Sequence, residues 1–90
     1  MATIHLIIQG KVQGVFYRAT AKKVADKMNL TGTVQNGKEG HVEIWASGSE
    51  EQLKKFILWC REGPSGAQVT DIQTDWVAEQ AFPEFSIVRK

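Results

Sequence analysis

The chain has 90 residues, 42% of them hydrophobic, which is enough for one core, so we expect a single domain over residues 1–90. Eleven Lys and Arg residues against ten Asp and Glu residues give a formal net charge of +1, which argues against the broad basic surface that non-specific nucleic-acid binding requires. A lone cysteine excludes an internal disulfide, and the amino terminus lacks a basic segment before a long apolar run, so we expect a cytoplasmic protein without a membrane segment.

The first predicted element is a strand over residues 3–9. Ile4, Leu6 and Ile8 alternate with the residues between them, which is the period of an extended chain with one buried face. The second element is a helix that ends near Asn29, because apolar residues recur at helical spacing and leave charged residues toward solvent. The apolar positions of this helix are Ala21, Val24, Ala25 and Met28.

Two further strands, residues 31–35 and 41–46, are predicted to pair as an antiparallel hairpin. The segment NGKEG between them has the length and the glycines of a hairpin connection. Taken alone, Asn36 in this segment is therefore interpreted as a turn residue.

A second helix is predicted to begin after Ser49. Ser49 and Gln52 have the spacing of a capping box, and Gly63 followed by Pro64 is typical of a helix end. The apolar stripe of this helix consists of Leu53, Phe56, Ile57 and Cys60. Because Cys60 lies on that stripe, we expect a buried structural thiol rather than a nucleophile.

The order of the elements predicts an α+β fold. Residues 69–77 supply a fourth strand and residues 85–88 a possible short fifth strand. This is the order of a ferredoxin-like split βαβ sandwich (βαββαβ), an antiparallel sheet with two helices on one face. In this arrangement the first strand lies beside the third, so the end of the hairpin must reach over the loop after the first strand. The fold serves many activities and by itself names no function.

The loop between the first strand and the first helix has the sequence GKVQGVFYR, residues 10–18. Gly10 and Gly14 allow backbone angles that turn N–H groups inward together, and the loop leads into a helix start, so it favours an anion such as phosphate. Arg18 can add a bidentate pair of hydrogen bonds to two phosphoryl oxygens. The alternative is a tight turn with an arginine that faces solvent. The P-loop and dinucleotide-binding fingerprints are both absent.

Two stretches together resemble the acylphosphatase family. GKVQGVFYR is similar to that family's loop, commonly G-x-V-Q-G-V-x-F-R, and GTVQNGKEGHV is similar to its G-[aromatic]-V-x-N-x-x-x-G-x-V signature. The resemblance spans nearly the whole chain. Thr33 stands where the family usually has an aromatic residue, and Tyr17 where it usually has phenylalanine. Tyr17 keeps the ring, and we expect it to keep the packing if its hydroxyl reaches a partner.

The resemblance implies an enzyme, a metal-independent monomer without cofactors that hydrolyses a small-molecule acyl phosphate to a carboxylate and inorganic phosphate. Water attacks phosphorus, and the departing carboxylate needs no proton because the pKa of its acid is roughly 4. The resemblance makes Arg18 the catalytic residue that binds phosphate and Asn36 the catalytic residue that positions the water, although an amide cannot act as a strong base. It assigns phosphate binding to the loop, whose substrate-binding residues are Gln13, Gly14, Val15, Phe16, Tyr17 and Arg18.

Other side chains are weaker candidates for chemistry. His5 and His41 have no cysteine or carboxylate partner at metal-ligand spacing, so no metal site is predicted. Trp45 or Trp76 could contact an acyl group.

Two other functions stay open at this point. An RNA-binding module of the same topology displays aromatic residues on its two central strands, but residues 3–9 have none and residues 41–46 have only Trp45. A phosphate-binding domain, like those in larger carbamoyl-transfer maturation proteins, is the second alternative, and the length of this chain argues against it. Metal-free hydrolysis of benzoyl phosphate separates the enzyme from either binder.

Overall fold

The computed structural model describes residues 1–89, in which strands and helices follow one another in the predicted order. The elements are β1 (Ala2–Lys11), α1 (Tyr17–Lys27), β2 (Thr31–Asn36), β3 (Val42–Gly48), α2 (Glu50–Glu62), β4 (Gln68–Val77) and β5 (Phe85–Val88). Two boundaries differ from the prediction, at the end of β2 and at the start of β3. β2 extends through Asn36, which pairs with Val42 instead of lying in the turn, and His41 precedes β3 instead of belonging to it.

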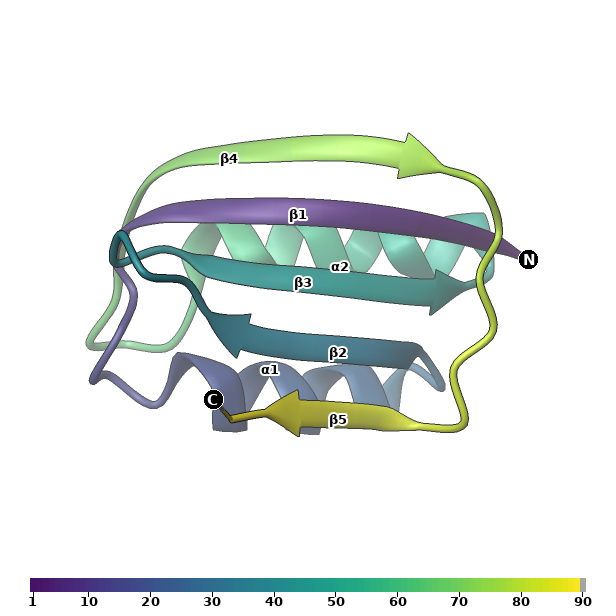
Figure 1. The fold of residues 1–90 in the computed structure, drawn as a ribbon, viewed down its shortest axis with the longest axis horizontal. Helices are drawn as coiled ribbons and strands as arrows, with labels where there is room; N and C mark the ends of the chain where they lie inside the picture. Colours follow the sequence, from purple (N-terminus) through teal and green to yellow (C-terminus); the bar gives the residue numbers. More distant parts are fainter. Residues whose placement is uncertain (90) are drawn as a thin grey trace.

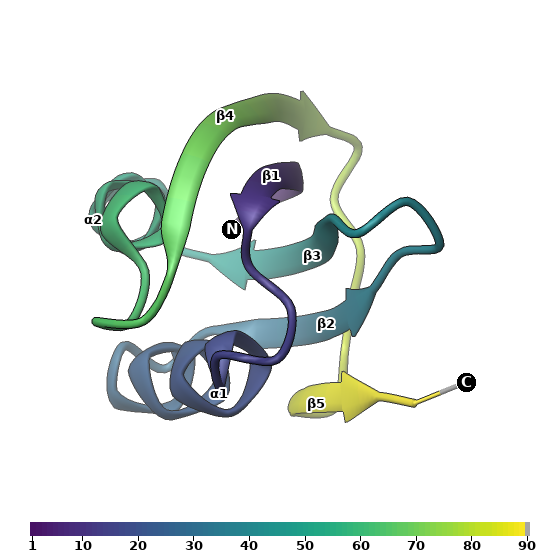
Figure 2. The same cartoon turned by 90° about the vertical axis from the view of Figure 1, so that its left-hand side faces the viewer.

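The five strands form one sheet in the order β4-β1-β3-β2-β5. Neighbouring strands are antiparallel except β2 and β5, which run parallel at one edge (Figure 1). Both helices lie on the same face of the sheet (Figure 2). The α+β, ferredoxin-like prediction is therefore confirmed, including the position of β1 beside β3. A connection over residues 78–84 runs from β4 across to β5 at the opposite edge (Figure 1).

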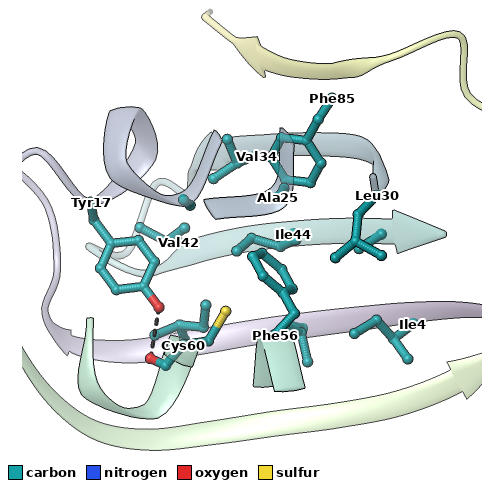
Figure 3. Packing of buried hydrophobic residues seen from close by; sticks show 14 of the residues in the cluster. Ile4, Tyr17, Ala25, Leu30, Val34, Val42, Ile44, Phe56, Cys60 and Phe85 are labelled. Carbon is teal, nitrogen blue, oxygen red and sulfur yellow. Dashed lines mark hydrogen bonds between the residues drawn. The ribbon is translucent and has the colours of Figure 1, made fainter. Parts of the chain in front are cut away.

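The hydrophobic core fills the space between the sheet and the helices (Figure 3). Ile4, Leu6 and Ile8 are fully buried, which confirms the face predicted from their alternation. Phe56 of α2 packs edge-on against Phe85 of β5, with ring centroids 6.1 Å apart.

The second helix begins and ends where its capping residues predict. The Ser49 side chain accepts a hydrogen bond from the Gln52 N–H at 3.2 Å, and Gly63 closes the helix with a positive φ of 67°. Cys60 of this helix is buried, and burial raises the pKa of its thiol to about 12. The thiol therefore stays neutral, as a structural residue should. Neither helix within residues 1–89 is long and apolar enough to cross a membrane.

Gly10 lies at an irregularity in the pairing of β1 with β4. The pairing of β1 with β4 shifts register between Gln9 and Gly10, and Gly10 has a φ of 128°. A Cβ atom on Gly10 would overlap the backbone carbonyl of Gln68, so close approach of the two strands requires glycine here. The extra residue at this irregularity, Thr70, lies in β4.

Tyr17 anchors the beginning of α1 in the core. Its side chain is fully buried and its hydroxyl donates to the Cys60 backbone carbonyl at 2.7 Å (Figure 3), so the hydroxyl has the partner expected for it. Burial raises the pKa of Tyr17 far above its usual range. Because this residue ties the first turn of α1 to the end of α2, it fixes the position of its neighbour Arg18.

Candidate active site

A cavity of about 330 Å³ opens at the end of the sheet where β1 passes into α1. Its walls come from the loop after β1, the first turn of α1 and the carboxyl ends of the parallel strands β2 and β5. The lining residues are Val12, Gly14, Phe16, Tyr17, Arg18, Ala19, Asn36, Ile87 and Arg89. Two of them are arginines and none is acidic, so the charge of the cavity favours an anion.

The loop side of the cavity has a left-handed backbone at two positions. Gly14 has a φ of 74° with open space where a Cβ would lie, and Phe16 has a φ of 62° although it is not a glycine. The N–H groups of residues 13–16 donate to no backbone or side-chain acceptor within residues 1–89. Unpaired N–H groups in a turn of this kind form an anion-binding concavity.

Arg18 is the second residue of α1 and lines the same cavity, half-buried. Phe16 at the N-cap offers no side-chain hydrogen bond to the first turn of this helix. No Asp or Glu side chain within residues 1–89 lies within salt-bridge distance of Arg18. The guanidinium and the positive end of the helix dipole are therefore both available to a negatively charged ligand.

Asn36 closes the cavity from the sheet. It is the last residue of β2 and, by strand alternation, shares its face with the buried Val34, so its side chain points toward the helices. The Asn36 Oδ1 atom is buried without a hydrogen-bond partner among residues 1–89. The Thr31 and Thr74 hydroxyls also lack partners, but neither lines the cavity. Asn36 thus presents an unsatisfied acceptor to the anion-favouring loop.

Gln13 connects the loop to the β2–β3 hairpin. Its Nε2 group donates to the Gly37 carbonyl at 2.8 Å and to the His41 carbonyl at 2.9 Å, while the Gly37 N–H donates to the His41 carbonyl at 2.8 Å. These bonds hold the hairpin end over the loop, as the strand order requires. They also keep Asn36, next to Gly37, in a fixed position relative to Arg18.

The predicted site residues divide into two groups. The structure brings Gly14, Phe16, Tyr17, Arg18 and Asn36 together around one cavity. The remaining two do not line it: the Gln13 side chain bonds to the hairpin, and the Val15 side chain packs against the core.

The expectation that a tryptophan could contact an acyl group is wrong for this cavity. Trp45 lies on the face of the sheet away from the helices, where it stacks on His5 with ring centroids 4.1 Å apart. Trp76 lies on β4, at the edge of the sheet opposite β5. Neither residue is among those that line the cavity.

Four of the lining residues were not predicted from the sequence: Val12, Ala19, Ile87 and Arg89. Two of them could have been found from the alternation of side chains in the last predicted strand, residues 85–88. Ile87 and Arg89 are two residues apart and so share a face with the buried Phe85. What the sequence could not indicate was that this strand pairs with β2.

His5 has a carboxylate partner that its sequence spacing did not reveal. The His5 Nε2 atom lies 2.6 Å from Glu43 Oε2, and Gln35 Nε2 donates to the other oxygen of Glu43 at 2.7 Å. The hydrogen bond to His5 lowers the pKa of Glu43 below its usual range. This group lies on the open face of the sheet, and within residues 1–89 no cluster of three His, Cys, Asp or Glu side chains is placed to hold a metal ion.

Comparisons of this chain with family models, with relatives and with solved structures all indicate the same family. The family model for acylphosphatase matches residues 4–87. The acylphosphatase of Methylococcus capsulatus is 40% identical over 90 residues, which cover 99% of this chain and 98% of the relative. That of Marinobacter nauticus is 45% identical over 82 residues, covering 90% and 89%. The crystal structure of acylphosphatase from Bacillus subtilis matches with a TM-score of 0.95 and 37% sequence identity. The match covers 99% of this chain and 100% of the other chain.

Proposed function

The chain belongs to the acylphosphatase family and is a hydrolase of acyl phosphates, and we propose that it carries out this hydrolysis in the cavity between the residue 10–18 loop and the end of β2. The substrate in this proposal is a small-molecule mixed anhydride of a carboxylic acid and phosphoric acid. The products are a carboxylate and inorganic phosphate.

The phosphoryl group binds to the loop side of the cavity. The unpaired N–H groups of Gly14 and Phe16, which line the cavity, donate to its oxygens, and the Arg18 guanidinium adds a bidentate, charge-assisted pair of hydrogen bonds. Charge that develops on the phosphoryl oxygens during the reaction meets donors that are already oriented. Such preorganised electrostatic stabilisation is the main contribution that a protein makes to phosphoryl transfer.

Asn36 positions the attacking water in this mechanism. Its Oδ1 atom accepts a hydrogen bond from the water and thereby directs a water lone pair at phosphorus. An amide does not take up a proton near neutral pH, so the proton of the water passes to the phosphoryl group or to solvent. Asn36 therefore acts by orientation and not as a general base.

The leaving group explains why the cavity needs no general acid. Water attacks phosphorus, the bond between phosphorus and the bridging oxygen breaks, and the electron pair leaves with the carboxylate. Because the pKa of a carboxylic acid is roughly 4, the carboxylate departs without a proton. The lining residues fit this requirement, since they include no carboxylic acid and no histidine.

The observation that carries the proposal is the unpartnered Asn36 Oδ1 atom in a cavity that also contains Arg18. The test is hydrolysis of benzoyl phosphate in ¹⁸O-labelled water with a chelator present. We expect rapid hydrolysis, with the label in inorganic phosphate. Label in benzoate would show attack at carbon, and activity that disappears with the chelator would show a required metal; either result contradicts the mechanism.

We also propose that the active form is a monomer. One chain supplies the loop donors, Arg18 and Asn36, so the proposed mechanism uses no residue from a second copy. Light scattering at the enzyme concentrations used for kinetics should give one chain's mass, 10.0 kDa. Activity that rises with the concentration of a dimer would contradict this.

A further inference from the structure

We propose that Asn36 is a deamidation site that the folded β2–β3 hairpin protects, and that the Gln13 side chain keeps the hairpin closed against this reaction. The chain has two asparagines, Asn29 and Asn36, and only Asn36 is followed by glycine. The nitrogen of a glycine is the least hindered nucleophile that a backbone offers, because no Cβ atom lies beside it. The inference goes beyond the proposed function, since it concerns the chemical lifetime of Asn36.

The reaction needs only the chain and water. The Gly37 nitrogen attacks Cγ of Asn36 and forms a C–N bond, the bond from Cγ to the side-chain nitrogen breaks, and ammonia leaves with the proton that the Gly37 amide gives up. The product is a cyclic succinimide. Water then breaks either bond between the ring nitrogen and a carbonyl carbon: its hydroxyl stays on that carbon and its proton goes to the nitrogen. The result is aspartate or isoaspartate at this position.

The hydrogen bonding of the hairpin keeps the reacting groups apart. The Gly37 N–H donates to the His41 carbonyl at 2.8 Å, and Asn36 pairs with Val42. Hydrogen bonds between paired strands lie in the plane of the sheet, whereas side chains stand roughly perpendicular to it. The Gly37 nitrogen therefore turns toward Cγ of Asn36 and releases its proton only after its bond to His41 opens.

Gln13 holds this hydrogen bond closed from outside the hairpin. Its Nε2 group donates to the Gly37 carbonyl at 2.8 Å and to the His41 carbonyl at 2.9 Å, so the acceptor of the Gly37 N–H is itself fixed by the loop. Both bonds are partly buried, where water competes less for the donors. Because a hairpin end opens when its few closing hydrogen bonds break, Gln13 makes this opening rarer.

The structure also shows why the reactive residue pair is present. A Cβ atom on Gly37 would overlap the His41 ring, so the packing of this ring on the hairpin favours glycine after Asn36. The Asn36 Oδ1 atom has no hydrogen-bond partner among residues 1–89, so no bond to this oxygen restrains the side chain. Protection therefore depends on the hydrogen bonds of Gly37 and Gln13.

Deamidation silences the proposed active site. It replaces a neutral amide with a carboxylate in the cavity that Arg18 also lines. The new negative charge repels the phosphoryl oxygens and competes with them for the Arg18 guanidinium. This consequence rests on the proposed function, whereas the reaction itself does not.

Peptide mapping by mass spectrometry measures the reaction directly, and a protein-isoaspartate methyltransferase detects the isoaspartate. The protein is incubated at mildly alkaline pH, either folded or unfolded in urea. We expect conversion of Asn36 to be about tenfold or more slower in the folded protein than in the unfolded chain. Gln13→Ala removes two hydrogen bonds and should speed up conversion in the folded protein about tenfold. Gln13→Glu, which keeps the side-chain length but cannot donate, should act in the same direction.

Gln73→Ala is the matched control, because it removes the same side chain from an exposed position on β4 and should leave the rate unchanged. Asn29 is an internal reference and should convert more slowly than Asn36 in the unfolded chain, because the side chain of Leu30 hinders the nitrogen that would attack it. Equal rates for Asn36 in folded and unfolded protein would overturn the proposal, as would Gln13 variants that convert no faster than the unsubstituted protein. Full activity on benzoyl phosphate in protein converted at Asn36 would instead contradict the proposed function.

Discussion

Two buried polar groups at opposite ends of the sheet differ in their hydrogen bonding within residues 1–89: the Thr3, Ser47 and Gln80 group is satisfied, although the neighbouring Thr31 hydroxyl is not, and the Asn36 Oδ1 atom is unpartnered. At the end where β1 begins, Thr3, Ser47 and Gln80 form a closed ring of hydrogen bonds: the Gln80 N–H donates to Thr3 Oγ1 at 2.9 Å, the two hydroxyls lie 2.7 Å apart, and Ser47 Oγ donates to the Gln80 carbonyl at 2.8 Å. Because Ser47 gives its only proton to Gln80, the Thr3 hydroxyl donates to Ser47. At the other end, Asn36 Oδ1 is buried and unpartnered.

The difference separates stability from function within one small fold. A satisfied ring at one end secures the residue 78–84 connection to the sheet. An unsatisfied acceptor costs roughly 1–3 kcal/mol, and a left-handed non-glycine residue such as Phe16 costs roughly 1–2 kcal/mol more. Such costs gather at sites where a ligand will supply the missing interactions. Substitutions in the Thr3, Ser47 and Gln80 group should therefore lower the free energy of unfolding, whereas substitutions at the cavity should lower catalytic activity.

The largest effect is expected at Arg18. Arg18→Gln removes the guanidinium that faces the phosphoryl oxygens, and we expect kcat/KM for benzoyl phosphate to fall about 10³-fold or more. The midpoint of chemical denaturation should change little, because Arg18 has no carboxylate partner within residues 1–89 to lose. A protein that keeps full turnover and full affinity for inorganic phosphate would remove Arg18 from the site.

Asn36→Ala should give the next largest loss and a different kinetic signature. We expect kcat to fall about 10²-fold while the inhibition constant of inorganic phosphate changes little, since Asn36 contacts the water and not the bound phosphoryl group. Gln35→Ala, one residue earlier on the opposite face, is the control and should keep normal kcat. Equal losses in turnover and phosphate affinity would mean that Asn36 only shapes the loop.

Ser47→Ala tests the hydrogen-bonded group at the end of the sheet where β1 begins. The substitution leaves the Gln80 carbonyl and the buried Thr3 hydroxyl short of a partner, so we expect the free energy of unfolding to fall by about 2 kcal/mol. Urea denaturation measures this change. Activity at a temperature where the variant is folded should stay normal, and a large loss of kcat there would mean that the two ends are coupled.

Gln13→Ala should give the smallest of these effects and show how the active-site end is held together. Without the bonds to the Gly37 and His41 carbonyls, Asn36 is less firmly placed over the loop, so we expect kcat to fall about tenfold. Affinity for inorganic phosphate should be retained, because the loop N–H groups remain. A loss of phosphate affinity equal to the loss of turnover would show that Gln13 shapes the loop instead of aligning Asn36.

The parts of the proposed site that could be predicted from sequence are those that depend on local chemistry. Because positive φ angles favour glycine and helix starts favour anions, residue type and order at Gly10, Gly14 and Arg18 indicated either an anion-binding loop or a tight turn, and the resemblance to the acylphosphatase family favoured the first. The role of the Gln13 side chain could not be assigned, since both of its acceptors are backbone carbonyls more than twenty positions away.

The position of Arg89 shows where prediction from sequence ends. The alternation of side chains in the four-residue strand β5 can be recognised in the sequence, but the strand with which β5 pairs is set by long-range packing. Only the parallel pairing with β2 brings Arg89 beside Asn36. The same reason explains the error at Asn36, which looks like a turn residue by type and becomes a strand residue through its pairing with Val42.

A crystal structure of the protein with bound inorganic phosphate tests the central claim most directly. We expect the anion in the cavity, with hydrogen bonds from the N–H groups of Gly14 and Phe16 and from the Arg18 guanidinium, and a water on Asn36 Oδ1 that faces phosphorus. Phosphate bound elsewhere with this cavity empty of anion, or Asn36 Oδ1 turned to another protein group, would contradict the account.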